Sequence, residues 1–322
     1  MSALLEIEDL SLRYHVAGGT LQALRHVSLT ARAGEVLGIM GESGCGKSSL
    51  AAAIIALLAR NAEVTGGAVR YRGRDILKMG AEEQRQLRGR HIAMIFQDPM
   101  TAFNPVLRIG EQLVDFQHHL AGVSRAERRA RALLQLQKVG IADAGLCLQR
   151  YPHELSGGMR QRAAIAAALL MSPDVLVADE PTTALDVTME AQIIHLLRQL
   201  QADYQGAVIV VTHHLGVIAE LCDRVAVMYA GEVVEEGLVD DIYHAPQHPY
   251  TRALLACDPA AIHDLARRLP TIGGQLPDLM RAPAGCSFAP RCPLARPICQ
   301  TEAPPRVRLS PDRMAQCHAV QA

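Results

Sequence analysis

The sequence has no tryptophan, and aromatic residues of all kinds make up only 3% of its 322 residues. Proteins that bind single-stranded nucleic acid without sequence preference stack the bases on aromatic side chains, so this scarcity argues against such a platform. The formal net charge is −1. A chain with so little net charge is not drawn as a whole to nucleic acid or to anionic lipid. The composition therefore predicts no nucleic-acid partner.

Long apolar runs are also missing. The longest, such as residues 50–59 and 163–171, fall well short of the ~18 residues that span a bilayer. The first ten residues, MSALLEIEDL, have no basic stretch followed by an apolar one, so we expect no signal peptide. We therefore expect a soluble protein whose work at any membrane depends on partner subunits.

A glycine-rich loop is the first strong feature that is present. Residues 41–48 read GESGCGKS, which matches the G-x-x-x-x-G-K-S loop that wraps the phosphates of a nucleotide. An apolar run at 35–40 and an Ala/Leu/Ile-rich segment at 47–59 supply the strand and the helix that this motif requires. We expect Lys47 to reach the β- and γ-phosphates and Ser48 to coordinate Mg²⁺. The predicted nucleotide-binding residues here are Gly41, Ser43, Gly44, Cys45, Gly46, Lys47, Ser48 and Ser49.

A second apolar run, residues 175–178, ends in two acids, Asp179 and Glu180. Ligands of open α/β sheets bind at the carboxyl ends of the strands. We therefore expect Asp179 to hold the Mg²⁺ shell and Glu180 to polarise the attacking water. An acidic surface turn is the alternative interpretation, and the upstream glycine-rich loop disfavours it.

Strand and helix patterns alternate along most of the chain, which is typical of a parallel α/β sheet. With 49% hydrophobic residues, the chain can bury a large core, and its length predicts about two domains. Ser124 followed by Glu127 is a capping box for a helix through residue 138. The predicted strands are 4–14 (an edge strand), 67–71, 91–96, 174–178, 207–212 and 224–229, and the predicted helices are 81–88, 190–204 and a helical insert at about 99–171.

The end of the chain has a different composition. Nine prolines lie between residues 270 and 311, and proline disfavours both helix and central strand. We therefore expect a loop-rich segment. Four of the eight cysteines lie here, at Cys286, Cys292, Cys299 and Cys317. Four thiolates can hold a [4Fe–4S] cluster or a tetrahedral zinc ion, and the spacing favours neither strongly. Free thiols or disulfides remain the alternative.

Together these motifs resemble those of ATP-binding cassette (ABC) transporter ATPases. Residues 155–161 read LSGGMRQ and match the signature of that family. Gln97 matches its Q-loop glutamine, residues 183–186 its D-loop and His213 its switch histidine, while Tyr14 lies where an aromatic ring usually stacks on adenine. The resemblance covers about residues 4–255, and the motifs occur in the order that the family shows.

The resemblance implies a P-loop NTPase fold of the α/β class. Its expected parts are a parallel-sheet core, an N-terminal antiparallel β region, a helical subdomain at about 99–171 and a small Cys-rich C-terminal extension. We predict a nucleotide-binding domain at 1–256 and the extension at 257–322.

The resemblance also implies a mechanism that uses two subunits. Two cassettes close head to tail around ATP, so that a helix N-terminus on one contacts the γ-phosphate bound to the other, an electrostatically favourable position for an anion. The residues expected to act across this interface are Ser156, Gly157, Gly158 and Asp186. The cofactors are then ATP and Mg²⁺, with Ser48, Gln97 and Asp179 as Mg²⁺ ligands. The expected catalytic residues are Glu180, His213, Gln97 and Lys47.

Finer matches point to one branch of the family. Residues 96–101, 151–160 and 179–186, with the His-Pro-Tyr-Thr element at 248–251, resemble the D-type ATPase of bacterial dipeptide, oligopeptide and nickel importers. The implied partners are an F-type ATPase, two transmembrane permeases and an extracytoplasmic solute-binding protein, which place the chain peripherally on the cytoplasmic face of the inner membrane. This branch is known for a C-terminal iron–sulfur site, which favours [4Fe–4S] over zinc.

Other functions remain as alternatives. The same ATPase role in an importer of nickel, opines or other small solutes is the nearest of them. A soluble ABC-type ATPase without a transport role, a P-loop kinase and a non-catalytic binding module are further from the observed motifs. The kinase would not need the residues at 155–158.

Cys45 occupies a loop position where serine is more usual. A thiol near a helix N-terminus can have a lowered pKa. We therefore expect alkylation of Cys45 to block ATP hydrolysis and bound ATP to protect against it.

Overall fold

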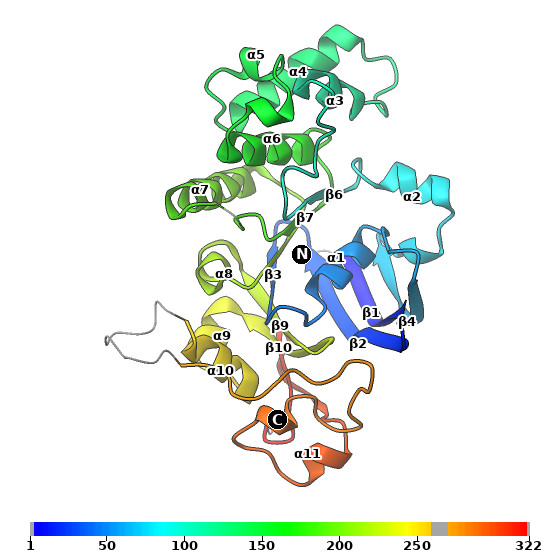
Figure 1. Ribbon diagram of the computed structural model, residues 1–322, viewed down its shortest axis with the longest axis vertical. Helices are drawn as coiled ribbons and strands as arrows, with labels where there is room; N and C mark the ends of the chain where they lie inside the picture. Colours follow the sequence, from blue (N-terminus) through cyan, green and yellow to red (C-terminus); the bar gives the residue numbers. More distant parts are fainter. Residues whose placement is uncertain (1–2, 184, 259–269, 321–322) are drawn as a thin grey trace. The chain divides into compact units, whose positions relative to one another are not determined.

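The computed structural model describes residues 3–183, 185–258 and 270–320 (Figure 1). It consists of two compact units. The first is built mainly from Lys78–Val210, and the second from Leu5–Ala31, Glu35–Leu77 and the described residues from Val211 onward. Each unit interleaves distant parts of the sequence, so each is described by itself.

The second unit contains a four-stranded sheet in the order β2-β1-β4-β5. Its strands are β1 (Ala3–Val16), β2 (Gly19–Arg32), β4 (Ala62–Tyr71) and β5 (Arg74–Asp75). β1 pairs antiparallel with β4 and has β2 on its other side. The predicted antiparallel N-terminal region is confirmed, but β1 is not an edge strand. The prediction was wrong because an inner strand of an antiparallel sheet with one solvated face also alternates polar and apolar residues.

The second unit also contains strands of a larger sheet, in the order β11-β12-β10-β9-β3. These are β3 (Val36–Met40), β9 (Arg224–Tyr229), β10 (Glu232–Leu238), β11 (Arg306–Ser310) and β12 (Arg313–Gln316). β3 and β9 are parallel, whereas β10 pairs antiparallel with β9 and β12. β3 and β9 are buried throughout, as expected of strands covered on both faces. The helices of this unit include α1 (Lys47–Ile54), α8 (Leu215–Leu221), α9 (Val239–His244) and α10 (Pro249–Ala256).

The C-terminal segment corrects another expectation. It is rich in loops, with a short helix α11 (Ile298–Thr301), yet it also adds strands β11 and β12 to the sheet. The prolines do not prevent this because Pro304 and Pro305 precede β11 and Pro311 lies in the turn before β12. Proline is tolerated at strand ends and turns, where no ladder hydrogen bond needs its missing N–H.

The first unit contains the neighbouring strands β8-β7-β6. They are β6 (Ile92–Ile95), β7 (Val175–Asp179) and β8 (Ala207–Thr212), and β6 is parallel to β7. Helices α2 (Ala81–Leu87) and α7 (Val187–Asp203) belong to this unit. β7 is buried along its whole length, so its apolar side chains fix the position at which its two terminal acids emerge.

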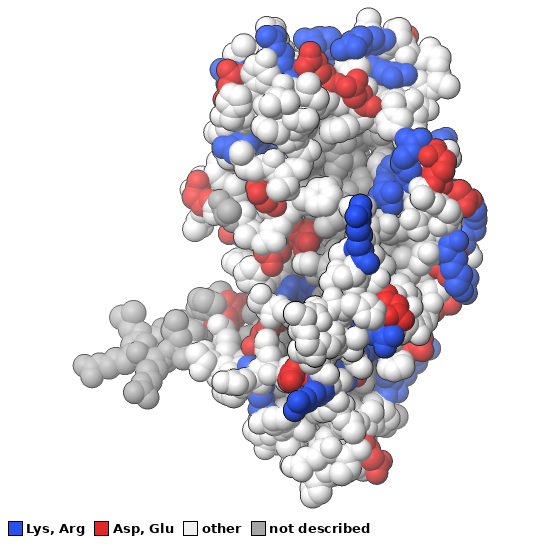
Figure 2. Space-filling model, turned by 45° about the vertical axis from the view of Figure 1, so that its right-hand side comes forward, with Lys and Arg blue, Asp and Glu red and all other residues white. Residues whose placement is uncertain are grey.

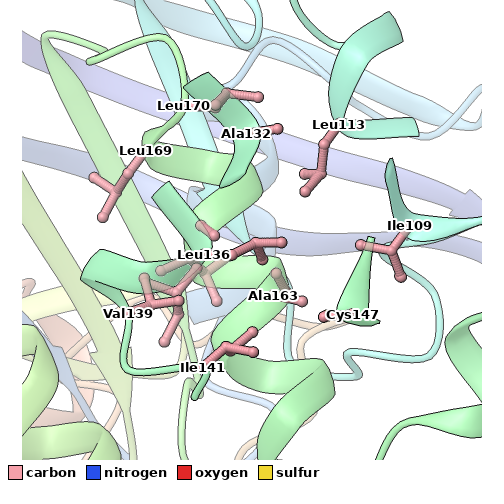
Figure 3. Packing of buried hydrophobic residues seen from close by; sticks show 14 of the residues in the cluster. Ile109, Leu113, Ala132, Leu136, Val139, Ile141, Cys147, Ala163, Leu169 and Leu170 are labelled. Carbon is pink, nitrogen blue, oxygen red and sulfur yellow. The ribbon is translucent and has the colours of Figure 1, made fainter. Parts of the chain in front are cut away.

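The predicted helical insert is confirmed within the first unit (Figure 1). Its helices are α3 (Ile109–Asp115), α4 (Arg125–Lys138), α5 (Ala144–Cys147) and α6 (Gly157–Leu169). The capping box at the start of α4 forms as expected, with Ser124 N donating to Glu127 at 2.8 Å and Glu127 N donating to Ser124 Oγ at 3.2 Å. Buried side chains from these helices, including Ile109, Leu136 and Ala163, pack into one core (Figure 3).

Several element boundaries differ from the sequence prediction for local reasons. α1 ends at Ile54 rather than at residue 59, because Ala56 has a φ of 50° and leaves the right-handed helix. β4 begins at Ala62, before the predicted start at residue 67. The register shift beside the Ser11–Gly66 pair is a β-bulge, which interrupts the alternation of side chains along the first half of the strand. α7 begins at Val187 because Asp186 caps it.

Charged side chains of both signs are interspersed on the face drawn in Figure 2. This mixture agrees with the near-zero net charge of the sequence. None of the helices in the described ranges is long and apolar enough to cross a membrane.

Candidate functional site

The glycine-rich loop joins β3 to α1, as the strand–loop–helix prediction requires. Gly41 has a φ of 155°, and a Cβ atom there would lie 2.2 Å from the carbonyl oxygen of Met228. Gly46 has a φ of 104°, and its Cβ would lie 2.5 Å from the carbonyl oxygen of Ala23. The loop is thus pressed against neighbouring backbone, and only glycine fits at these two positions.

Lys47, the first residue of α1, is buried, with 6% of its surface exposed. Its Nζ donates to the carbonyl oxygens of Gly41 at 2.7 Å and Glu42 at 3.0 Å. These two carbonyl oxygens hold the ammonium beside the loop. Ser48 follows on the exposed side of the helix start. A helix N-terminus with a fixed ammonium is a favourable place for phosphate oxygens.

The loop cysteine contradicts its prediction. Cys45 is completely buried, and burial raises the pKa of its thiol even though Lys47 nearby opposes the shift. The desolvation of a thiolate therefore outweighs the positive end of the helix, and the expectation of a lowered pKa was wrong. Cys45 fills space behind the loop.

This correction gives a testable result. At neutral pH we expect Cys45 to resist alkylation by N-ethylmaleimide with or without ATP, because the reactive thiolate is scarce and the sulfur is shielded. Peptide mass mapping of the folded protein checks this, and modification of Cys257, which is partly exposed, serves as the positive control. Rapid ATP-sensitive labelling of Cys45 would contradict the burial argument.

In the first unit, the two acids lie at the carboxyl end of β7. Asp179 is 6% exposed, and Glu180 follows it directly. Gln97, just after β6, donates from Nε2 to Glu180 Oε2 at 2.8 Å, and Thr183 Oγ1 donates to the same oxygen at 2.9 Å. The structure thus brings together two predicted catalytic residues that are 83 positions apart in the sequence.

The signature motif begins a helix, as expected. Ser156 is the N-cap of α6, and its Oγ accepts a hydrogen bond from Met159 N at 3.3 Å. A Cβ atom on Gly158 would lie 1.5 Å from Cε of Met189, so this glycine permits close packing against α7. Asp186 caps α7 by accepting from Met189 N at 2.9 Å. Ala184, within the predicted D-loop, lies outside the described residues.

The remaining predicted nucleotide contacts lie in the second unit. His213 follows β8 and is exposed, while the backbone N–H of His214 donates to Thr212 Oγ1 at 3.0 Å. Tyr14 donates from its hydroxyl to Ser49 Oγ at 3.2 Å, which places the ring beside the helix that follows the glycine-rich loop. Adenine stacking by Tyr14 stays a prediction.

The four C-terminal cysteines line a single pocket together with His248 and Phe288. All eight cysteines of the chain are free thiols. Burial raises the pKa of Cys292 and raises that of Cys286 to about 11. Within the described ranges, no three His, Cys, Asp or Glu side chains are arranged so as to hold a metal ion. The thiols therefore share a pocket, but their present arrangement gives the expected cluster no direct support.

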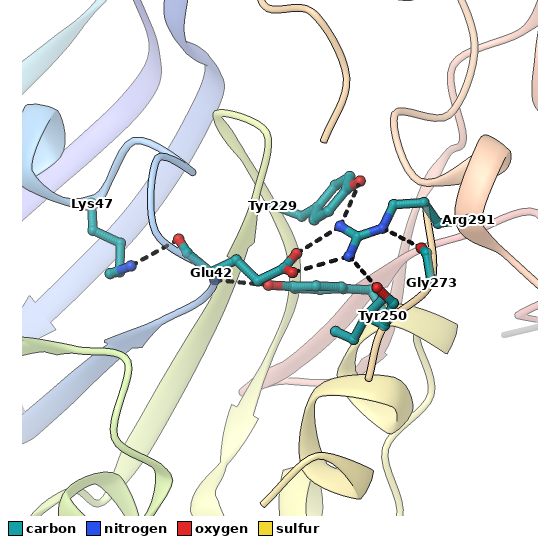
Figure 4. Close-up of polar contacts among 7 residues, drawn as sticks. Glu42, Lys47, Tyr229, Tyr250, Gly273 and Arg291 are labelled. Carbon is teal, nitrogen blue, oxygen red and sulfur yellow. Dashed lines mark hydrogen bonds and ion pairs between the residues drawn. The ribbon is translucent and has the colours of Figure 1, made fainter. Parts of the chain in front are cut away.

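The sequence patterns did not indicate that Glu42 is an anchor of the glycine-rich loop. Its backbone N–H donates to Tyr250 Oη at 2.9 Å, and its carboxylate pairs with Arg291 (Figure 4). Arg291 lies next to a predicted metal-ligand cysteine, and Tyr250 belongs to the His-Pro-Tyr element. No spacing rule links residues separated by more than 200 positions, so only the fold could show this contact.

His248 of that element is 1% exposed and caps α10, where its Nδ1 accepts from Tyr250 N at 3.0 Å. Its own backbone N–H donates to the buried carboxylate of Glu235 at 2.9 Å. Burial lowers the pKa of His248 to about 4. The neutral imidazole is therefore the form that the fold requires.

This pKa predicts a pH dependence of stability. Below about pH 6.5 the unfolded chain binds a proton at His248, whereas the folded chain does so only near pH 4. The free energy of unfolding should therefore fall as the pH is lowered through this window, by up to about 3 kcal/mol. Urea unfolding across the window checks it. His248→Asn, which keeps a capping acceptor but does not titrate, should show a shallower fall, and an unchanged slope would contradict the assignment.

Comparison with known proteins agrees with this geometry. The family model described as ABC transporter matches residues 24–183, and the model described as Oligopeptide/dipeptide transporter, C-terminal region, matches residues 234–299. A model described as AAA domain, putative AbiEii toxin, Type IV TA system, overlaps at residues 148–219. The region that contains the glycine-rich loop and the region that follows residue 233 are thus each matched by a transporter family model.

Relatives match along nearly the whole chain. The oligopeptide transport ATP-binding protein OppD of Salmonella typhimurium is 46% identical over 98% of this chain and 93% of its own length. The dipeptide transport ATP-binding protein DppD of Lactococcus lactis is 45% identical over 97% of this chain and 89% of its own. The dimeric structure of MJ0796, a bacterial ABC transporter cassette, superposes with a TM-score of 0.66 at 30% identity, covering 73% of this chain and 98% of that one.

The chain has the features that define a P-loop ATPase. They are a glycine-rich loop between a strand and a helix, a strand that ends at Asp179 with Glu180 directly after it, and a capped helix at the signature motif. The chain belongs to the ABC transporter family, as an ATP-binding protein that carries the C-terminal region of the oligopeptide/dipeptide transporters.

Proposed function

We propose that this ATPase drives the import of dipeptides or oligopeptides by a bacterial ABC transporter. The observation that carries the proposal is the match of both regions, the cassette and the C-terminal region, to relatives named as oligopeptide and dipeptide transport ATP-binding proteins over 97–98% of the chain. We assign the cassette to residues 1–256 and the extension to 257–322. The relatives give no reason to prefer nickel, opines or another solute.

The mechanism follows from the residues already described. Lys47 and the loop glycines would bind the β- and γ-phosphates, and Ser48, Gln97 and Asp179 would hold the Mg²⁺ ion. The ion, when bound, neutralises developing charge on the phosphates. Glu180 accepts a proton from the attacking water and so makes it a better nucleophile, while His213 orients that water and holds the γ-phosphate. The Gln97–Glu180 hydrogen bond supports this assignment because it links the proposed water-activating group to a proposed Mg²⁺ ligand.

Two cassettes share each ATP in this mechanism. Ser156, Gly157, Gly158 and Asp186 of one subunit act on the nucleotide held by the other. The N-terminus of α6 suits a γ-phosphate, because the first N–H groups of a helix have no intrahelical partner. Closure then needs ATP, and hydrolysis removes the charge that bridges the subunits. The solved relative MJ0796 is described as dimeric, which supports a dimer for this chain.

The partners follow from the same proposal. We infer an F-type ATPase as the second cassette, two membrane permeases beneath which both cassettes sit, and an extracytoplasmic binding protein that delivers the peptide. The chain would then lie on the cytoplasmic face of the inner membrane as a peripheral subunit. Tyr14 would stack on adenine.

A gene deletion in the source bacterium tests the transport assignment. Uptake of a radiolabelled dipeptide and a labelled pentapeptide should fall to background in the deletion strain and return with the wild-type gene. The Glu180→Gln gene should not restore it. Loss of ⁶³Ni²⁺ uptake with unchanged peptide uptake would assign the chain to nickel import and reject the peptide proposal.

We further propose that Cys286, Cys292, Cys299 and Cys317 hold a [4Fe–4S] cluster, with zinc as the alternative. Their convergence on one pocket supports the proposal, and a bound metal would supply the positive charge that deprotonates these buried thiols. The role is structural, since the cluster would staple a short segment. Anaerobically purified protein should be brown and absorb at about 400 nm. Stoichiometric zinc without iron would contradict the iron assignment. The absence of both metals from the purified protein would reject the proposed site.

A further inference from the structure

Glu42 is held at three points within the second unit (Figure 4). Its carbonyl oxygen accepts from Lys47 Nζ at 3.0 Å, its N–H donates to Tyr250 Oη at 2.9 Å, and its carboxylate accepts from Arg291 at 2.8 and 3.0 Å. One residue of the phosphate loop is therefore tied at once to the loop lysine, to α10 and to the C-terminal segment.

The Arg291 side chain is buried and hydrogen-bonded at several points. It is 4% exposed. Besides Glu42, it donates from Nε to the carbonyl oxygen of Gly273 at 2.9 Å, from Nη2 to that of Ile272 at 3.0 Å and from Nη1 to Tyr229 Oη at 3.3 Å. A guanidinium whose donors are fixed in a plane presents two parallel hydrogen bonds to a carboxylate in one geometry only.

The other anchor is equally fixed. Tyr250 is fully buried, and its ring packs against those of Tyr229 and Phe288, with centroids 4.6 and 5.4 Å away. Tyr229 is also the ring over which the Arg291 guanidinium lies, at 5.7 Å. The two anchors of Glu42 thus pack against the same aromatic cluster.

These contacts hold the residue that follows Gly41 in the glycine-rich loop. The carbonyl oxygens of Gly41 and Glu42 are the same two that hold the Lys47 ammonium. A binding loop that is held in its bound shape before the ligand arrives loses less entropy on binding. Fixing Glu42 therefore fixes both the path of the loop and the position of its lysine.

We propose that Arg291 is a positioning residue for nucleotide binding: from the C-terminal segment it holds Glu42, and through Glu42 it keeps the phosphate loop in its ATP-binding conformation. The inference rests on the proposed phosphate-binding role of the loop. It gives the C-terminal segment a part in ATP binding that does not depend on which metal, if any, its cysteines hold.

The test measures the affinity of the purified full-length chain for MgATP by titration calorimetry. Arg291→Gln and Glu42→Gln should each weaken binding about tenfold, a typical size for a direct coupling between contacting groups. The double variant should lose no more than about tenfold, because the second change removes a contact that is already broken. Independent effects would multiply to about 100-fold.

A matched control separates positioning from folding. Arg313 also ties the C-terminal segment to the body of the second unit, through the carbonyl oxygen of Ala245, without touching the loop. Arg313→Gln should lower Tm as Arg291→Gln does, yet leave the Kd for MgATP within about twofold of wild type. A merely structural role of Arg291 would reduce the competent fraction in the titration and leave the Kd of the remainder unchanged.

The outcomes distinguish this inference from the function on which it rests. Lys47→Ala should abolish MgATP binding, and if it does not, the assignment of the phosphate loop itself fails. If Lys47→Ala abolishes binding while Arg291→Gln leaves the Kd unchanged, or if the two Gln variants are multiplicative, the positioning role alone is rejected.

Discussion

Replacing Glu180 by glutamine is expected to lower kcat for ATP hydrolysis by at least about 100-fold, the effect of losing a positioned general base. The amide keeps the size of the side chain and can still accept from Thr183, which donates to the carboxylate at 2.9 Å. It cannot take a proton from water. The affinity for MgATP should change little, because the phosphates bind to the glycine-rich loop.

The measurement is steady-state phosphate release by the assembled transporter, together with nucleotide binding. Glu190→Gln is the matched control, since it makes the same chemical change on α7, where the carboxylate accepts from Thr182 at 3.1 Å, and it should hydrolyse ATP at nearly the wild-type rate. If the Glu180→Gln protein turns over at the wild-type rate, another group must activate the water, and His213 would be the first to test.

Replacing Arg224 by alanine is expected to destabilise the second unit by about 3–5 kcal/mol, the usual cost of leaving buried charges without their partner. The Arg224 side chain is 4% exposed and donates to Glu35 at 2.8 and 3.2 Å, as well as to Glu236 and to the carbonyl oxygen of Thr30. Glu35 is itself only 8% exposed. Truncation strands its carboxylate in the interior, where water cannot replace the guanidinium.

Urea unfolding of the full chain, followed by circular dichroism, checks this expectation. Arg70→Ala removes an ion pair with Glu8 in which the two side chains are 38% and 50% exposed, and pairs of this kind contribute at most about 1 kcal/mol. The two variants should therefore differ clearly in their unfolding midpoints. Equal midpoints would mean that the Arg224 network contributes no more than a surface pair.

The sequence was sufficient for features that are local or that follow a fixed motif spacing. The phosphate loop with its flanking strand and helix, the capping box at Ser124 and the two acids that end β7 all lie where they were predicted. Each depends on neighbours within a few residues, so a short window carries the whole signal. The hydrogen bond between Gln97 and Glu180 was not predicted, and it forms because both residues lie just beyond the carboxyl ends of neighbouring parallel strands.

The features that the sequence did not reveal depend on tertiary contacts. β2 was missed and β1 was wrongly placed at an edge, because pairing partners are not visible in one strand's own pattern. Cys45 was expected to be reactive because its position near a helix start was visible, whereas its complete burial was not. The Glu42–Arg291 pair joins residues 249 positions apart, and nothing local marks either partner.

The most direct test of the account is a structure of the Glu180→Gln transporter trapped with MgATP, solved with its natural partner subunits. The account predicts that Ser156 and the first N–H groups of α6 lie within hydrogen-bond distance of a γ-phosphate whose remaining contacts come from the glycine-rich loop of the opposite cassette. An ATP molecule enclosed by a single chain, with Ser156 distant from every phosphate, would contradict it.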